Sequence, residues 1–151
     1  MNKARSARPI RFYMDTGKWG FLSPMYLCPV RIGGREYRSA EHYYQSMKAS
    51  NEGKREWIRN SATGYEAKER AHALGAEELA SKSPDQKIAT MREAFIAKFT
   101  QNRELGIKLL ETGETELLED SPDDPFWGAK GENWIGRLAM ETRLKIRKQK
   151  V

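Results

Sequence analysis

Two short apolar runs in the first forty positions predict β-strands. They cover residues 10–14 and 25–32, and short runs of this kind bounded by turn residues are typical of strands. Gly33 and Gly34 follow the second run, and paired glycines tolerate the positive φ angles of a hairpin turn into residues 35–38. The pattern therefore predicts a small antiparallel sheet near the N-terminus.

Beyond this sheet the apolar residues repeat at helical spacing. In residues 40–49, Ala40, Tyr43 and Met47 share one face, and Ser39 stands at the N-cap position. Further helices are predicted over residues 52–60, from 63, from 83, over 102–112 and over 133–148. The chain is therefore expected to fold as an α+β protein that is mostly helical.

Capping signals support the ends of several of these helices. Thr63 and Glu66 have the spacing of a capping box. Ser83 and Gln86 repeat that spacing, with a proline at the first helical position between them. Gly113 suits the left-handed residue that ends the helix over 102–112.

Residues 114–132 form the least regular stretch, with two prolines, two glycines and a tryptophan. We expect a long structured loop here, and such loops carry function more often than short connectors do. The sequence has no internal repeat and no low-complexity tract. A second domain is therefore not expected.

Length and composition narrow the class of protein. With 151 residues, 38% hydrophobic and 32% charged, the chain is too apolar for a disordered protein and too polar for a membrane span. Residues 1–11 lack the apolar stretch of a secretory signal. The single cysteine, Cys28, excludes an internal disulfide, so a cytoplasmic location is expected.

The net charge of +6 is concentrated at the two ends of the chain. Residues 1–11 hold four basic residues and residues 143–150 hold five, which leaves 18 basic and 21 acidic residues between them. Basic ends of this kind can contact the phosphates of a nucleic acid, whereas the near-neutral body offers no evident face for a duplex. The alternative is that the ends are solubilising tails.

A first candidate site lies on the predicted helix over 40–49. Helical spacing places Glu41, Tyr44, Gln45 and Lys48 on one polar face, which fits a helix that lines a pocket. Glu41 falls in the first turn, where the helix dipole favours its ionised form and a fixed carboxylate can stabilise positive charge. The alternative is an acid on an exposed helix, paired with Lys48 or a nearby arginine. His42 is expected to make a structural hydrogen bond.

A second candidate site lies in residues 119–128, where carboxylates and a large aromatic ring share one loop. Trp127 could stack on a base or flank a sugar, or it could be an ordinary core residue. The acids do not match the spacing of a calcium loop. No cluster of Cys and His offers a zinc site either.

A third stretch, residues 128–136, is a glycine-rich approach to a helix that Asn133 would cap. Free backbone N–H groups near Gly128, together with Lys130, could hold a phosphate. The glycine spacing does not match a dinucleotide-binding fingerprint or a P-loop. An ordinary loop is the alternative.

These stretches, in this order, resemble the NADAR family, the YbiA-like N-glycosidases. A single motif of this size would mean little, but the ordered set is specific and covers roughly residues 10–147. The matching pieces are Phe12-Tyr13, residues 20–23, residues 39–45 with Lys48, Met91-Arg92, Lys98-Phe99, Gln101-Asn102, Leu109-Leu110, Thr112-Gly113, residues 124–128, Asn133, Gly136, Met140 and Arg143.

The resemblance implies a mostly helical α+β domain over residues 10–147, flanked by basic ends at 1–9 and 148–151. It implies hydrolysis of the N-glycosidic bond of a ribosylated substrate, without a metal or a cofactor. Substrates in the family include phosphorylated ribosylamino-pyrimidines of riboflavin synthesis and ADP-ribose attached to guanine. Of the residues considered above, it implies catalytic roles for Glu41 and Asp124 and substrate-binding roles for Trp127, Tyr44, Lys48, Gly128, Lys130 and Asn133.

The sequence departs from the family's pattern at three places. Pro24 replaces a usual asparagine, Ser83 replaces a tryptophan of the riboflavin-pathway members, and Gly75-Ala76 replaces a usual glycine-arginine pair. These changes favour an ADP-ribosyl or other nucleotide substrate over a riboflavin intermediate. The alternative function is a non-catalytic module that binds ADP-ribose or another nucleotide.

Overall fold

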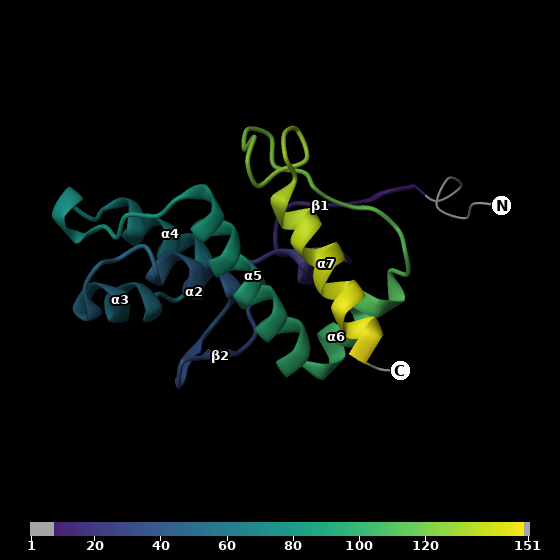
Figure 1. Ribbon diagram of the computed structural model, residues 1–151, viewed down its shortest axis with the longest axis horizontal. Helices are drawn as coiled ribbons and strands as arrows, with labels where there is room; N and C mark the ends of the chain where they lie inside the picture. The colour runs from purple at the N-terminus through teal and green to yellow at the C-terminus, as the bar shows by residue number, and fades with distance from the viewer. Residues whose placement is uncertain (1–7, 150–151) are drawn as a thin grey trace.

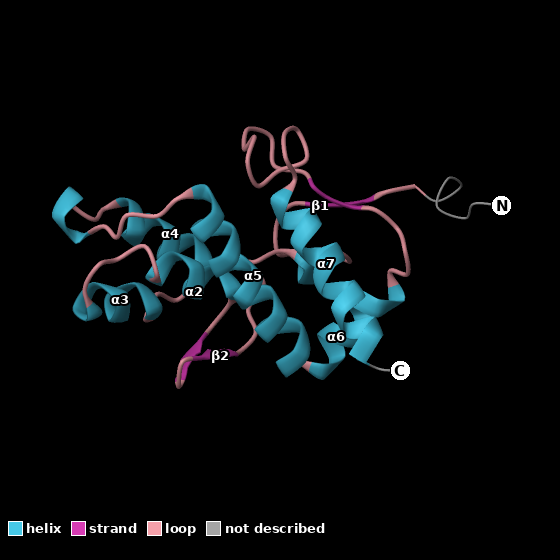
Figure 2. Ribbon diagram, viewed as in Figure 1, coloured by secondary structure: helices cyan, strands magenta, loops and turns pink. Residues whose placement is uncertain are grey.

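The computed structural model describes residues 8–149, and their fold is mostly helical with four short strands (Figures 1 and 2). The strands are β1 (Ile10–Phe12), β2 (Val30–Ile32), β3 (Arg35–Tyr37) and β4 (Leu117–Glu119). The helices are α2 (Ala40–Ser46), α3 (Glu52–Arg59), α4 (Gly64–His72), α5 (Pro84–Gln101), α6 (Arg103–Glu111) and α7 (Trp134–Gln149), with short 3₁₀ turns at Gly20–Leu22 and Ala76–Glu78. The predicted α+β fold, with a small antiparallel sheet near the N-terminus, is confirmed.

Local signals in the sequence account for the ends of these elements. Gly33 and Gly34 adopt φ angles of 63° and 80° in the turn between the antiparallel strands β2 and β3. The Ser39 side chain caps α2 by accepting a hydrogen bond from the His42 backbone N–H at 3.1 Å. Ser83 caps α5 in the predicted capping box.

The strand pairing differs from the prediction in one respect. β1 does not join the hairpin; it pairs in parallel with β4, with Ile10 opposite Leu117. β4 lies inside residues 114–132, which were predicted to form a long structured loop. Leu117 is fully buried there, so burial of an apolar side chain, together with hydrogen bonding to β1, holds this segment in an extended conformation.

Helix α5 runs through the middle of the molecule, between the group α2 to α4 on one side and the pair α6 and α7 on the other (Figure 1). Its side chains Met91, Phe95 and Phe99 are buried in the main core, together with Leu138 of α7. A smaller apolar cluster fills the space around α3 and α4; it consists of Ala49, Ile58, Ala67, Ala71 and Leu74. The cavity described below is framed by α2 and α4 on one side and by the loop after β4 on the other.

Most of the two predicted basic ends lies outside the described residues, namely residues 1–7 and 150–151. Residues 148 and 149 belong to α7, which ends at Gln149. Within residues 8–149, no helix is both long enough and apolar enough to cross a membrane.

Candidate active site

A cavity of about 700 Å³ lies between the polar face of α2, helix α4 and the loop that follows β4. Residues 13–14 and 23–25, Met91 of α5 and Ile135 of α7 also line it. Five of the predicted site residues line it together: Glu41, Tyr44, Lys48, Asp124 and Trp127. The fold therefore brings the first two candidate stretches together, although about eighty residues separate them in the chain.

Glu41 is fixed at the start of α2. Its backbone N–H donates to the Pro24 carbonyl oxygen at 3.0 Å, and its Oε2 accepts a hydrogen bond from Gln45 Nε2 at 2.5 Å. Gly64 at the start of α4 packs directly against it, since a Cβ on Gly64 would lie 3.1 Å from the Glu41 Cβ. The carboxylate is thus held in one place, with only 7% of the residue exposed.

Burial raises the pKa of Glu41 above the ordinary value for a glutamate. The hydrogen bond from Gln45 and the charges of Lys48 and Lys68 oppose that rise, and the charge of Asp124 adds to it. The helix dipole was expected to favour the ionised form, but desolvation outweighs it. A buried carboxylate of this kind gains most from a positive charge that develops beside it.

Asp124 is oriented by the backbone of its own loop. Its Oδ1 accepts hydrogen bonds from the backbone N–H groups of Phe126 at 3.0 Å and Trp127 at 2.9 Å. The Trp127 ring packs edge-on against Tyr44, with 5.4 Å between ring centroids. One carboxylate and one large ring are therefore presented to the cavity by the same turn.

Three predicted site residues do not line the cavity: Gly128, Lys130 and Asn133. Lys130 Nζ donates to the Pro122 carbonyl oxygen at 3.1 Å on the exposed side of the loop. Asn133 adopts a φ of 54°, and its side chain bonds to the backbone of Leu117 and Glu119 on β4 instead of capping α7.

The expected free N–H groups in this stretch are also taken up within the loop. The backbone N–H of Gly128 donates to the Asp124 carbonyl at 3.0 Å, that of Gly131 to the Gly128 carbonyl at 3.1 Å, and that of Asn133 to the Gly128 carbonyl at 2.8 Å. A Cβ on Gly128 would lie 2.7 Å from the Asp124 carbonyl oxygen. The glycine-rich stretch therefore supports the Asp124 turn, and the N–H groups of Gly128, Gly131 and Asn133 are not available to a phosphate.

Three cavity residues of α4 were not singled out from the sequence, whereas Glu119 and Ser121 belong to the predicted second stretch, residues 119–128. Tyr65, Lys68 and His72 lie on one side of α4, at a spacing of three and four residues that the sequence could have revealed. Glu119 and Ser121 lie under the loop, where the Ser121 hydroxyl donates to the Glu119 carboxylate. Burial raises the pKa of Glu119, and its hydrogen bonds with Ser121 oppose the rise.

His42 has the structural role expected of it. The residue is fully buried, with Nδ1 2.6 Å from the Ser39 hydroxyl and Nε2 2.9 Å from the Ser61 carbonyl oxygen. Because a carbonyl oxygen can only accept, Nε2 carries the proton and donates it. His42 ties α2 to the start of α4 and does not line the cavity.

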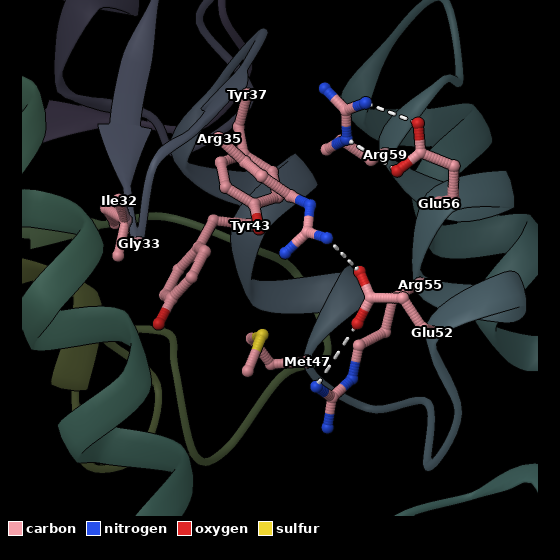
Figure 3. A pocket seen from close by; sticks show the side chains of 10 residues that line it. All are labelled: Ile32, Gly33, Arg35, Tyr37, Tyr43, Met47, Glu52, Arg55, Glu56 and Arg59. Atoms are coloured by element: carbon pink, nitrogen blue, oxygen red, sulfur yellow. Dashed lines mark hydrogen bonds and ion pairs between the residues drawn. The ribbon is translucent and has the colours of Figure 1, made fainter.

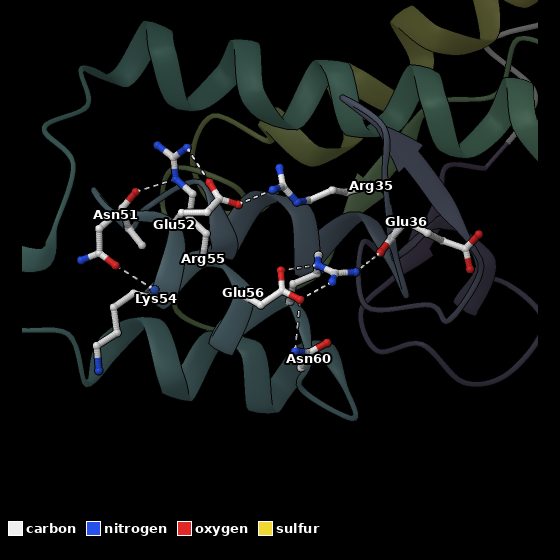
Figure 4. Close-up of polar contacts among 10 residues, drawn as sticks. Arg35, Glu36, Asn51, Glu52, Lys54, Arg55, Glu56 and Asn60 are labelled. Atoms are coloured by element: carbon white, nitrogen blue, oxygen red, sulfur yellow. Dashed lines mark hydrogen bonds and ion pairs between the residues drawn. The ribbon is translucent and has the colours of Figure 1, made fainter.

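A second, smaller cavity of about 140 Å³ lies against the other face of α2, where Tyr43 and Met47 point (Figure 3). Its charged side chains are paired with one another. Arg35 lies 2.8 Å from Glu52 (Figure 4). Arg59 forms a hydrogen-bonded ion pair with Glu56 (Figure 3). Arg55 Nε donates to the Ala49 carbonyl oxygen at 2.9 Å.

The fold and the residues of the larger cavity are typical of a particular class of enzyme. A mostly helical α+β domain presents two fixed carboxylates and a half-buried tryptophan to one cavity, the inventory typical of enzymes that cleave glycosidic bonds. Among residues 8–149, no group of three or more His, Cys, Asp or Glu side chains is arranged to hold a metal ion.

The chain belongs to the NADAR family, because the sequence profile of the NADAR domain matches residues 11–147. The N-glycosidase YbiA of Escherichia coli strain K12 is 33% identical over 141 residues, which cover 91% of this chain and 88% of the relative. A riboflavin biosynthesis protein of Vibrio vulnificus is 33% identical over 148 residues, covering 92% of this chain and 39% of that protein. The solution structure of E. coli YbiA matches the fold with a TM-score of 0.83 at 32% identity, covering 93% of this chain and 86% of that chain.

Proposed function

We propose that this protein is an N-glycosidase that hydrolyses the C1′–N bond of a ribosylated, nucleotide-type substrate. The observation that carries the proposal is that Glu41, Asp124 and Trp127 line one cavity. Membership of the NADAR family and the N-glycosidase name of the E. coli relative support the same class of reaction.

In the proposed mechanism, the C1′–N bond breaks and its electron pair stays on the nitrogen of the leaving base, which takes up a proton. Positive charge then develops on C1′ and the ring oxygen of the ribose. The buried Glu41 carboxylate stabilises this charge, and it needs no reorganisation because Gln45 and the start of α4 hold it in place. A water molecule adds its oxygen to C1′ and releases a proton.

Asp124 and Trp127 have complementary roles in this proposal. The Asp124 carboxylate, fixed through Oδ1 by two backbone N–H groups, orients the attacking water or the ribose hydroxyls. The Trp127 ring, braced by Tyr44, stacks on the leaving base. Stacking of a base on an aromatic side chain is worth about 1–3 kcal/mol.

Two substrate classes fit this site: a phosphorylated ribosylamino-pyrimidine of riboflavin synthesis, and ADP-ribose attached to a guanine base. The name of the Vibrio relative supports the first. The sequence departs from the family's pattern at Pro24 and Ser83, and these departures favoured the ADP-ribosyl substrate. Pro24 lines the cavity, whereas Ser83 is the cap of α5 and does not line it. We keep both classes in the proposal, together with contact between the basic ends and a nucleic-acid substrate.

The test is incubation of the purified protein with each substrate class, with the released sugar measured by mass spectrometry. Glu41→Gln serves as the matched control, because it keeps the size of the side chain and removes the charge. Release of sugar by the parent and not by the variant supports the proposal. Tight binding without release from either substrate would indicate the alternative, a nucleotide-binding module that does not turn over.

A further inference from the structure

Lys98 is a fully buried lysine of α5 that the proposed mechanism does not use and that does not line the larger cavity. Its Nζ donates a hydrogen bond to the Ser23 carbonyl oxygen at 2.7 Å. Among residues 8–149, no carboxylate forms an ion pair with it. A charge buried without a counter-ion costs stability, so an apolar side chain at this core position would favour the fold more.

The surroundings of Lys98 keep its side chain charged at neutral pH. Nζ lies over the rings of Phe99, Tyr26 and Phe95, at 5.0, 5.6 and 5.8 Å from their centroids, and ring faces attract cations. Burial lowers the pKa of Lys98 to about 8, and the charge of Cys28 opposes that change. Lys98 therefore donates to Ser23 as an ammonium group, which makes the stronger, charge-assisted kind of hydrogen bond.

The acceptor of this hydrogen bond belongs to the wall of the larger cavity. Residues 23–25 line that cavity. The Ser23 carbonyl oxygen also accepts from the Tyr26 backbone N–H at 3.1 Å, and the Ser23 hydroxyl accepts from the Met25 backbone N–H at 3.1 Å. Lys98 thus holds, from the core side, the carbonyl group at which this turn closes.

The same wall segment is bonded to the backbone of Glu41. The first N–H groups of a helix have no partner within the helix, and that of Glu41 donates to the Pro24 carbonyl oxygen at 3.0 Å. The position of Glu41 at the start of α2 is therefore coupled to the position of residues 23–25. One covalent step separates the carbonyl that Glu41 uses from the carbonyl that Lys98 uses.

We infer that Lys98 is a positioning residue, which holds residues 23–25 and, through Pro24, the backbone of Glu41 in the geometry that the reaction needs. The inference rests on the proposed function, because the position of Glu41 affects the rate only if its carboxylate stabilises the developing charge. Lys98 acts from the core and does not touch the substrate. A misplacement of about 1 Å in a reacting group costs up to about a hundredfold in rate.

The first test is amide hydrogen exchange of the full chain, measured by NMR in the parent and in Lys98→Met. Methionine keeps a long side chain in the core and removes the ammonium group. We expect the Glu41 amide to exchange about tenfold faster in the variant, beyond any change that the amides of α5 share. The His42 amide, which is bonded to Ser39 Oγ in the same turn, should follow α5.

Leu109→Ala is the matched control, because Leu109 is a fully buried residue of the same core that does not line the cavity. It lowers stability without touching the Lys98 hydrogen bond, so its Glu41 amide should change only as much as the amides of α5. An equal additional change at Glu41 in both variants would overturn the inference. The same holds if Lys98→Met leaves the Glu41 amide in step with α5.

A second measurement needs no variant of Lys98, so it decides the matter even if Lys98→Met does not fold. In the parent, the ¹³C shift of the Ser23 carbonyl should titrate with a midpoint near pH 8, where Lys98 loses its proton. Cys28 and Tyr26 are the other titratable side chains that face Lys98. Cys28→Ser and Tyr26→Phe should each keep this midpoint, and a Ser23 carbonyl that does not titrate with Lys98 would overturn the inference.

Kinetics test the step from Lys98 to Glu41. Lys98→Met should lower kcat by about tenfold to a hundredfold, while Leu109→Ala keeps the parent's kcat. In a Glu41→Gln background, Lys98→Met should cause no further loss, since the carboxylate that it positions is already gone. Full additivity of the two losses would overturn positioning through Glu41. A parent that releases no sugar from either substrate class would overturn the proposed function, and the exchange and titration results would still decide whether Lys98 holds Glu41.

Discussion

The two cavities that flank α2 differ in how their charges are balanced. In the smaller one, Arg35 pairs with Glu52 and Arg59 with Glu56. In the larger one, the buried Glu41, Lys48 and Lys68 line the wall without forming ion pairs to one another among residues 8–149. Charges satisfied within the protein hold elements together, whereas charges left unsatisfied in a cavity are available to a ligand.

One short helix and the two residues that follow it contribute to both cavities. Glu41, Tyr44 and Lys48 face the larger cavity, while Tyr43 and Met47 face the smaller one. Substitutions in the walls of the two cavities can therefore be compared, since they differ in which side of α2 they reach.

The largest difference in reaction rate should be between a substitution of Glu41, which is buried at the larger cavity, and one of Glu56, which is paired with Arg59 at the smaller cavity. Glu41→Gln should lower the rate of sugar release by about a hundredfold to a thousandfold, the effect of losing one preorganised electrostatic contact in a transition state, about 2.7–4 kcal/mol. Glu56→Gln, in the smaller cavity, should leave the rate unchanged. Steady-state kinetics of both variants check this, and a Glu41→Gln rate within about threefold of the parent would refute the catalytic role.

The next largest difference should be in KM, between substitutions of Trp127 at the larger cavity and of Tyr43 on the other side of α2. Trp127→Ala should raise KM for a base-bearing substrate about fivefold to a hundredfold, because the leaving base loses its stacking partner, worth about 1–3 kcal/mol. Trp127→Phe keeps a ring and should recover much of the loss. Tyr43→Phe removes only a hydroxyl that donates to Glu93 at 2.6 Å on the other side of α2.

KM values measured for all three variants separate stacking from a general effect on α2. An increase in KM for Tyr43→Phe as large as that for Trp127→Ala would show that the two sides are not independent. A normal KM for Trp127→Ala would remove the ring from the binding site.

These contrasts also indicate which parts of the structure were predictable from sequence. The helix caps at Ser39 and Ser83 and the hairpin turn at Gly33 and Gly34 were predicted correctly, because each depends on neighbouring residues. The parallel pairing of Ile10 with Leu117 was not predicted. It depends on burial against a core formed by the whole chain, which no short window of sequence contains.

The residues of the larger cavity likewise fall into those that the sequence predicted and those that it did not. Glu41, Tyr44 and Lys48 could be grouped from helical periodicity alone. Lys68 and His72 were missed because their place in the cavity depends on the packing of α4 against α2, which Gly64 permits by close contact with Glu41. Asn133 was assigned to a helix cap, but its left-handed backbone turns the side chain to β4, a conformation that the residue type permits without specifying.

The pH dependence of stability should be smaller than these kinetic effects. Because burial raises the pKa of Glu41, the folded state holds a proton that the unfolded state releases in the window between the ordinary glutamate pKa and the raised one. The contribution of Glu41 to stability therefore falls as pH rises through that window. Glu41→Gln has no such proton to lose.

Glu41→Gln should thus be more stable than the parent at neutral pH, with a melting temperature higher by about a few degrees. The advantage should disappear below the ordinary glutamate pKa, where Glu41 is protonated in both states. Thermal unfolding of both proteins across this pH range checks the prediction. A variant less stable than the parent at neutral pH would mean that the ionised carboxylate stabilises the fold.

The smallest effect is expected for an ion pair of the smaller cavity. Arg35 and Glu52 are both about half exposed, at 48% and 55% of their side chains, and exposed pairs couple by about 0.2–1 kcal/mol. A double-mutant cycle with Arg35→Ala and Glu52→Ala, followed by urea unfolding, should give a coupling free energy in this range that falls in high salt. All members of the cycle should release sugar at the parent's rate, because neither side chain reaches the larger cavity. A loss of activity in the single variants would show that the smaller cavity also takes part in the reaction, and the division of α2 into a structural side and a binding side would then be wrong.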